Sequence, residues 1–233
     1  MANRIHPTAI IGAEVDLGDD NVIGPYTVIA GPCRIGDGNY IGPHVSLGGP
    51  AEYLGADHLA GWDGETGGPG VVIGDRNRIR EFVTVNQGVT EPTTVGDDCY
   101  LMGRAHVAHD CRLDDGVIVT SAVQIAGHCH VWSGANLGLG TVVHQRVRIG
   151  PGAMVGMGSA VRKEVGAFTI TVGNPARTTG VNTIGLQRRG CSEESIAALT
   201  GFLTGNDAEP AAADLPEELA ALLKAWADRG PQH

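Results

Sequence analysis

A six-residue period of aliphatic side chains constrains this chain more than any other feature of its sequence. Stepping by six from Ile11, every stop as far as Leu47 is Ile or Leu, and from Val95 to Val161 twelve consecutive stops are Ile, Leu or Val. Helices repeat about every 3.6 residues and strands about every two, so neither explains this period. It is typical of a parallel β-helix, in which three hexads of about 18 residues form one triangular coil.

The residues beside each aliphatic position support the same architecture. Glycine follows many of them, and we expect it to allow a turn that a Cβ would strain. The fourth residue after each aliphatic position is small or medium-sized and is expected to point inward near a corner. Four of the five cysteines hold this position and are predicted to be buried side chains rather than disulfide partners or metal ligands: Cys33, Cys99, Cys111 and Cys129.

The period divides the chain into three parts. Residues 1–165 are predicted to form the β-helix, interrupted by insertions at 49–70 and 87–94, which can carry function because they leave a rigid scaffold. Residues 166–190 are expected to be an irregular connection. Residues 191–233 hold eight acidic and two basic side chains and are expected to be a short acidic helical tail. The predicted fold is an all-β solenoid with a short C-terminal α-helical extension.

Two helices are predicted within the acidic tail. The first begins after Ser192, a favourable N-cap, and continues through apolar residues at helical spacing. The second begins near Pro216 and carries its apolar residues on one side, including Leu219, Leu223 and Trp226.

Composition and charge exclude several classes of protein. The chain has 36 glycines but only 4% aromatic residues, which argues against a long helical bundle. A net charge of −10 argues against general nucleic-acid binding. No run of apolar residues is long enough for a membrane span, and the N-terminus lacks the apolar segment of a secretory signal. We therefore expect a cytoplasmic protein.

Four histidines are predicted to gather on or beside one edge of three successive coils: His106, His109, His128 and His144. Adjacent coils are about 4.8 Å apart, so the imidazoles would lie close to one another. Two chemistries compete for them, zinc ligation and proton transfer. Proton transfer is the better interpretation, because Asp110 follows His109 directly and can orient its ring, and because no carboxylate or thiolate clearly completes a zinc site.

Six segments resemble, in order, the UDP-N-acetylglucosamine O-acyltransferase family of lipid A synthesis: IHPTAIIG, IGDRNRIRE, AHVAHDC, IAGHCHV, VHQ and GVNTIGLQRRG. The resemblance extends from about residue 5 to residue 195. It implies a homotrimer of left-handed β-helices with active sites between subunits, within the hexapeptide-repeat acyltransferase superfamily. It implies transfer of an acyl group from acyl carrier protein to the 3-hydroxyl of a UDP-sugar, without a metal, a cofactor or a covalent intermediate.

The resemblance also implies roles for single residues. His109 would be the general base, Asp110 its partner, and the backbone N–H of Gly127 the oxyanion donor. The remaining residues would bind substrates: His106, His128, His144 and Gln145 around the sugar and acyl group, and Asn182, Arg188 and Arg189 at the nucleotide. Met157 stands where a small residue lets a long acyl chain pass, so we expect a shorter acyl group, with Met102 also in the acyl-chain pocket.

Departures from the family pattern leave the substrates open. The insertion 49–70 contains no Lys or Arg, where the family loop supplies a lysine and an aspartate, and Ile184 stands where a glutamate is typical. The tail is acidic, as is acyl carrier protein, so coenzyme A is a second possible donor. The acceptor group can be a hydroxyl or an amine. Two other functions remain alternatives: a metalloenzyme of the γ-carbonic-anhydrase type and a non-catalytic nucleotide-binding β-helix.

Overall fold

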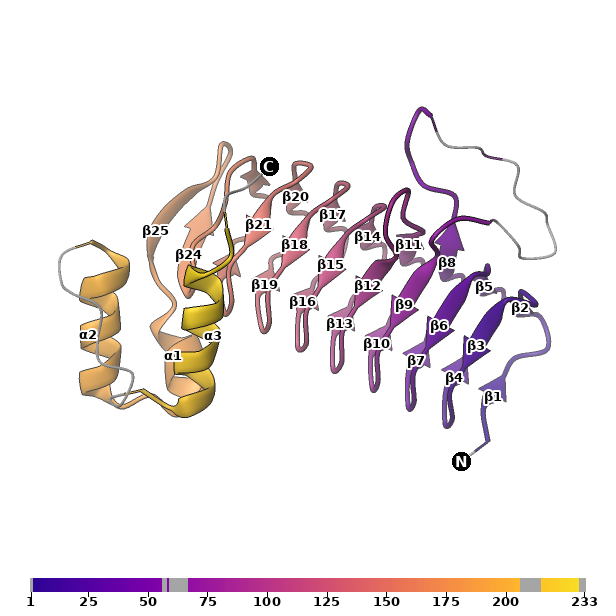
Figure 1. The fold of residues 1–233 in the computed structure, drawn as a ribbon, viewed down its shortest axis with the longest axis horizontal. Coiled ribbons are helices and arrows are strands. Elements are labelled where there is room, and N and C mark those ends of the chain that lie inside the picture. The colour runs from indigo at the N-terminus through magenta and orange to yellow at the C-terminus, as the bar shows by residue number, and fades with distance from the viewer. Residues whose placement is uncertain (1, 56–57, 59–66, 206–214, 231–233) are drawn as a thin grey trace.

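A computed structural model describes residues 2–55, 58, 67–205 and 215–230, and in it the chain winds into an elongated solenoid followed by three helices (Figure 1). Each coil contributes one short strand to each of three sheets, so the sheets form the sides of a prism. We name them sheets A, B and C in the order in which the chain visits them. Edges AB, BC and CA are the rows of turns that connect one sheet to the next.

The strands of the three sheets follow one another along the prism. Sheet A contains β1 (Arg4–Ile5), β4 (Val22–Ile23), β7 (Tyr40–Ile41), β10 (Arg78–Ile79), β13 (Tyr100–Leu101), β16 (Ile118–Val119), β19 (Asn136–Leu137), β22 (Met154–Val155), β24 (Thr169–Val172) and β25 (Arg177–Val181). Sheet B contains β2 (Ile10–Ile11), β5 (Val28–Ile29), β8 (Ser46–Gly49), β11 (Thr84–Asn86), β14 (His106–Val107), β17 (Gln124–Ile125), β20 (Val142–Val143) and β23 (Ala160–Val161). Sheet C contains β3 (Val15–Leu17), β6 (Cys33–Ile35), β9 (Val71–Ile73), β12 (Thr93–Val95), β15 (Arg112–Leu113), β18 (His130–Val131) and β21 (Arg148–Ile149).

The six-residue period predicts the strand register correctly. Val22 pairs with Tyr40 and Gln124 pairs with Val142, each 18 residues further along the chain, and the pairing is parallel. The aliphatic positions are buried from Ile23 to Val161 and form one continuous core. Ile11 and Leu17 are only partly buried because they lie in the first coil, at the open end of the prism.

The glycines that follow the aliphatic positions serve a different purpose from the one expected. Gly24 does not have a positive φ; instead, a Cβ on Gly24 would lie 2.8 Å from the backbone of Gly42 in the next coil. These glycines therefore permit close stacking of coils. The left-handed turn position comes two residues later and is often not glycine, as in Asp110 with φ of 54° and His128 with φ of 60°.

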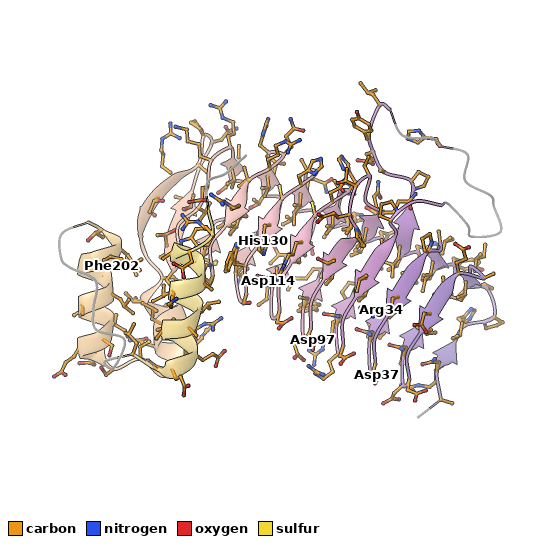
Figure 2. All side chains as sticks on the ribbon, viewed as in Figure 1. Arg34, Asp37, Asp97, Asp114, His130 and Phe202 are labelled. Atoms are coloured by element: carbon orange, nitrogen blue, oxygen red, sulfur yellow. The ribbon has the colours of Figure 1, made fainter. Side chains whose placement is uncertain are left out.

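Edge CA is held by a ladder of aspartates that cross from one coil to the next. The Oδ1 atoms of Asp37, Asp75, Asp97 and Asp115 each accept the backbone N–H of the aspartate one coil earlier, at distances of 2.7–2.8 Å. Asp37 and Asp97 lie at these turns along the lower edge in Figure 2. Four acidic side chains of a strongly acidic protein are thus used in holding the coils together.

The connection 166–190 is not irregular, which corrects the expectation from sequence. Its β24 continues sheet A in parallel with β22, and β25 pairs antiparallel with β24. A short helix follows, α1 (Thr183–Arg188). The six-residue repeat is absent from this segment of the sequence. Its regular structure comes instead from packing, because Phe168 is fully buried in a second core beneath the helices.

The two predicted tail helices are present. Helix α2 (Glu193–Leu203) begins after Ser192, whose side chain accepts the N–H of Ser195. Helix α3 (Glu217–Ala227) follows Pro216 and buries Leu219, Leu223 and Trp226 against the same second core. Figure 1 shows both helices beside the last coils of the solenoid. None of the described helices has the length and apolar character needed to cross a membrane.

The cysteines behave as the repeat predicts. All five are free and buried. Burial raises the pKa of the Cys33 thiol to about 12, and burial is also the largest effect that raises the pKa of Cys99 to about 12. Cys33 and Cys99 are therefore small core side chains with little thiolate at neutral pH.

The two kinds of glycine position predict losses of stability of different size on substitution. Gly24→Ala is expected to destabilise the fold by about 1–3 kcal/mol, because the new Cβ meets rigid backbone. Gly140→Asn is expected to cost less than about 1 kcal/mol, because its left-handed turn is open and asparagine tolerates that conformation. Denaturation followed by circular dichroism would compare them. Equal losses of stability would contradict the stacking explanation.

Candidate active site

Edge BC collects most of the residues that the sequence singles out. Its successive turns carry His109 with Asp110, Gly127 with His128, and His144 with Gln145. Both insertions also leave the solenoid at this edge, the first after β8 and the second after β11 (Figure 1). Residues 93 and 94 belong to β12, so the second loop covers only 87–92, and residues 56–57 and 59–66 of the first insertion lie outside the described residues.

His109 and Asp110 form a close pair at this edge. The Nδ1 atom of His109 lies 2.7 Å from Oδ2 of Asp110, and only 11% of the His109 side chain and 4% of the Asp110 side chain are exposed. Asp110 occupies the left-handed turn position, which turns its carboxylate toward the ring of the preceding residue. The pair is therefore built by the local backbone of one turn.

The second insertion holds the Asp110 carboxylate. Its Oδ2 accepts the N–H of Val89 at 2.9 Å, and its Oδ1 accepts the N–H and hydroxyl of Thr90, both at 2.8 Å, and the N–H of Glu91 at 3.0 Å. Partial burial alone would raise the pKa of Asp110. The hydrogen bonds from Glu91, His109, Val89 and Thr90 outweigh it and hold that pKa well below its usual value.

An ionised Asp110 determines which nitrogen of His109 carries the proton. A carboxylate only accepts hydrogen bonds, so Nδ1 must donate, and in the neutral ring Nε2 keeps its lone pair. Nε2 can then accept a proton from a group in front of it. The 87–92 loop thus supports a base indirectly, by keeping its partner charged.

Gly127 lies directly in front of this nitrogen. A Cβ at Gly127 would be 2.6 Å from Nε2 of His109, so only glycine leaves the space free. The Gly127 N–H donates to no acceptor among the described residues, whereas the equivalent N–H groups on edge CA are taken by the aspartate ladder. A free N–H beside a base is the arrangement that an oxyanion site requires.

A pocket of about 300 Å³ opens on sheet B beside the dyad. It is lined by His106, His109, Gly127, Gln145 and Glu52, together with residues of β17 and β20 and the adjoining Ala108 and Ala126. His106 is fixed on both sides: its Nδ1 lies 2.7 Å from the Thr84 hydroxyl and its Nε2 lies 3.3 Å from Oε2 of Glu52.

The other two histidines lie beside this pocket. The His128 ring meets the His109 ring edge-on, with centroids 5.0 Å apart. Burial, together with the positive charge of Arg146 and the neighbouring His109, lowers the pKa of His128 and so favours its neutral form. His144 is exposed, and its Nδ1 is 3.2 Å from the Gln145 carbonyl oxygen. Gln145 lines the pocket, whereas His144 does not.

The remaining predicted residues lie on other edges of the same chain. Met102 and Met157 are in turns of edge AB, on the far side of sheet B, and Met157 is 75% exposed. Asn182 caps α1 and donates to the Gly152 carbonyl oxygen beside edge CA. Arg189 packs over the Phe168 ring, and Arg188 is exposed. A single chain therefore does not bring these residues to the histidines.

Sequence reasoning missed the residues that the insertions contribute. Glu52 contacts His106, Tyr53 lies with its ring 6.2 Å from the His109 ring, and Thr90 binds Asp110. The interruption of the hexad register marks both loops but cannot show which of their residues turn back toward the edge. That depends on where the loops leave the prism.

His109, Asp110 and His128 could together hold a metal ion by distance alone, since one ligand atom from each lies within 4.8 Å of the others. The chemistry of the donors does not fit. Asp110 already accepts five hydrogen bonds, one of them from the His109 nitrogen nearest to it. A metal would have to replace several of these bonds.

Comparison with known proteins agrees with the fold. Residues 14–49 match the model of the bacterial transferase hexapeptide (six repeats), and residues 165–204 match that of the UDP-N-acetylglucosamine O-acyltransferase domain 2. An acyl-[acyl-carrier-protein]–UDP-N-acetylglucosamine O-acyltransferase of Burkholderia orbicola is 48% identical over 84% of this chain and 80% of its own length. A Burkholderia mallei protein of the same name is 45% identical over 55% of this chain and 50% of its own length.

Two solved structures share the architecture over nearly the whole chain. LpxA from Acinetobacter baumannii has a TM-score of 0.73 at 27% identity and covers 99% of this chain and 96% of its own. The UDP-N-acetylglucosamine O-acyltransferase from Moraxella catarrhalis has a TM-score of 0.68 at 31% identity and covers 94% of this chain and 91% of its own.

The donor set at His109 predicts weak metal binding. Protein purified without chelator and dialysed against zinc is expected to hold well below one zinc per chain by elemental analysis, because ligation would break the hydrogen bonds of Asp110. His109→Gln is expected to leave the residual zinc content unchanged. One zinc per chain that disappears in this variant would favour a metalloenzyme.

Proposed function

Because this chain belongs to the UDP-N-acetylglucosamine O-acyltransferase family, we propose that it transfers an acyl group from a thioester to a nucleotide-activated sugar with His109 as general base. The observation that carries this proposal is the arrangement around Nε2 of His109. Nδ1 is held by an ionised Asp110, and a free N–H of Gly127 lies on the open side of the ring.

The reaction follows from these groups. Nε2 of His109 takes the proton of the acceptor group, whose oxygen or nitrogen attacks the thioester carbonyl carbon. The carbonyl oxygen becomes negative and is stabilised by the Gly127 N–H. When the carbon–sulfur bond breaks, the thiolate leaves and takes the proton back from His109. Asp110 stays ionised throughout and stabilises the charged imidazole between the two proton transfers.

The names of the relatives suggest the substrates. They are named for UDP-N-acetylglucosamine and acyl carrier protein, and these are the acceptor and donor that we assign first. Coenzyme A remains a second donor, because the C-terminal helices present acidic residues such as Glu217 and Glu218, which repel an acidic carrier protein. Glu52, which lies in the pocket, is an acceptor suited to a sugar hydroxyl or an amine.

The distribution of residues over three edges supports active sites between subunits of a homotrimer. In this arrangement, His109 on edge BC of one subunit would face edge AB of a neighbouring subunit, which carries Met157. The nucleotide-binding roles proposed for Asn182, Arg188 and Arg189 likewise require a neighbouring subunit. A substrate bound there would contact two chains at once.

Removing the base tests the mechanism. His109→Ala is expected to lower kcat by about 10²–10⁴-fold, because no other group accepts the acceptor proton. Release of free thiol from acyl donors in the presence of UDP-N-acetylglucosamine or other nucleotide sugars measures the rate. His144→Ala, at an exposed position of the same edge, serves as a matched control and is expected to have the smaller effect.

The same assay separates the alternatives. Undiminished thiol release by His109→Ala would exclude His109 as the base. If the wild-type protein binds a nucleotide sugar in calorimetry but releases no thiol from any donor, it is a non-catalytic binding protein.

The exposed Met157 predicts the acyl length. Its side chain is expected to stop the acyl chain early, so Met157→Gly should shift the preference toward longer donors while leaving transfer from short donors nearly unchanged. A series of thioesters that differ only in chain length measures this. An unchanged preference would contradict the role of Met157.

The proposed site between subunits has a separate test. Light scattering of the purified protein measures its mass in solution, and the mass of a monomer would contradict a site shared between subunits.

A further inference from the structure

A second cavity, of about 390 Å³, lies at the C-terminal end of edge BC. One wall is the turn after β23, which carries Arg162 and Lys163, and the other is the hairpin formed by β24 and β25, in which Arg177 begins β25. The Ala176 N–H donates to the Ala160 carbonyl oxygen at 3.0 Å, which fixes the hairpin on the last strand of sheet B. Three cationic side chains thus surround one cavity.

No acid neutralises these cations within the part of the chain that the structure describes. Glu164 lines the cavity, but Arg148 and Arg229 bind its carboxylate. Arg162 and Lys163 form no ion pair with any described residue, and Arg177 donates only to the adjacent carbonyl oxygen of Ala176.

Some arginines elsewhere in this acidic protein are paired with nearby acids, whereas others, such as Arg34 and Arg78, form no ion pair among the described residues. Arg76 lies within 4 Å of three aspartates, and Arg80 and Arg112 each bind one acid. An unpaired group of two arginines and a lysine around a cavity has the chemistry of a phosphate site.

This cavity, the cation pocket, continues the active-site pocket. Val142 and Val143 line the active-site pocket, and their strand partners Ala160 and Val161 line the cation pocket. Apolar residues on two paired neighbouring strands therefore line the two pockets. The turn of His109 and the turn of Arg162 are three coils apart, which corresponds to about 14 Å at the usual strand spacing.

The separation between the His109 turn and the Arg162 turn matches the length of the phosphopantetheine arm, which every candidate donor carries. In a phosphopantetheine thioester, about 13 bonds separate the sulfur from the phosphate, which is about 15 Å for an extended chain. Acyl carrier protein and coenzyme A share this arm. We propose that the cation pocket binds the phosphate of the phosphopantetheine arm while the thioester lies at His109; the assignment rests on the proposed acyltransferase function.

Binding tests the pocket without any turnover. In calorimetry, the wild-type protein is expected to bind 4′-phosphopantetheine at least 10-fold more tightly than pantetheine, which lacks the phosphate. The double variant Arg162→Ala/Lys163→Ala should lose this difference. Arg34→Ala removes an exposed arginine of β6 on sheet C, away from the cavity (Figure 2), and should keep it. Equal binding of the two ligands by the wild-type protein would overturn the proposal.

Kinetics then identify the source of the phosphate. The double variant is expected to lower kcat/KM at least 10-fold for acyl-phosphopantetheine, acyl coenzyme A and acyl carrier protein, and to leave acyl-pantetheine unchanged. Whichever of acyl coenzyme A and acyl carrier protein gives the wild-type protein the higher kcat/KM is the carrier of the acyl group. A loss confined to acyl carrier protein would overturn the phosphate assignment, because the cations would then contact the acidic surface of the carrier.

The proposed function and the cation pocket can fail separately. If the wild-type protein transfers from no donor but binds phosphopantetheine through Arg162 and Lys163, the pocket stands and the acyltransferase function fails. If transfer is normal and the double variant lowers kcat/KM equally with and without the phosphate, the pocket assignment fails and the function stands.

Discussion

The stacking of one coil directly on the next is the constraint on which the rest of this structure depends. Parallel strands about 4.8 Å apart bring the backbone of one turn against the backbone of the following turn. A Cβ at Gly24 would lie 2.8 Å from the next coil, so this position must be glycine. The left-handed residue two positions later carries no such restriction, which leaves it available for Asp, His or Arg. Asp110 and His128 use that freedom.

The same stacking gives the three edges different uses. On edge CA, aspartates take the outward N–H groups of the preceding coil and hold the coils together. On edge BC, the N–H of Gly127 stays open, and the loops that interrupt the repeat bring Glu52 and Thr90 to the histidines. The proposed site therefore lies at the edge where inserted chain leaves the repeat.

The charged side chains along edge BC also differ from one position to the next. Burial alone would make Asp110 harder to ionise, but three backbone N–H groups, a hydroxyl and a ring nitrogen keep it charged. His128 loses part of its basicity through burial and a nearby arginine. At the far end of the same edge, Glu164 is bound by two arginines, so the cations of the cation pocket face the cavity without an acid. An acidic protein thus presents a positive surface beside its proposed site.

The sequence by itself determined the solenoid, the strand register, the buried cysteines and the Ser192 cap of the first tail helix, because each depends on residues at fixed separations along the chain. It also indicated His109 and Asp110, which are adjacent. It could not determine the β24–β25 hairpin, which has no hexad and is ordered by the packing of Phe168. Only the tertiary structure decided that Thr90 holds Asp110 and that Met157 lies on a different edge from His109. Both depend on which turns the coils bring side by side, and a period cannot specify how an inserted loop folds back.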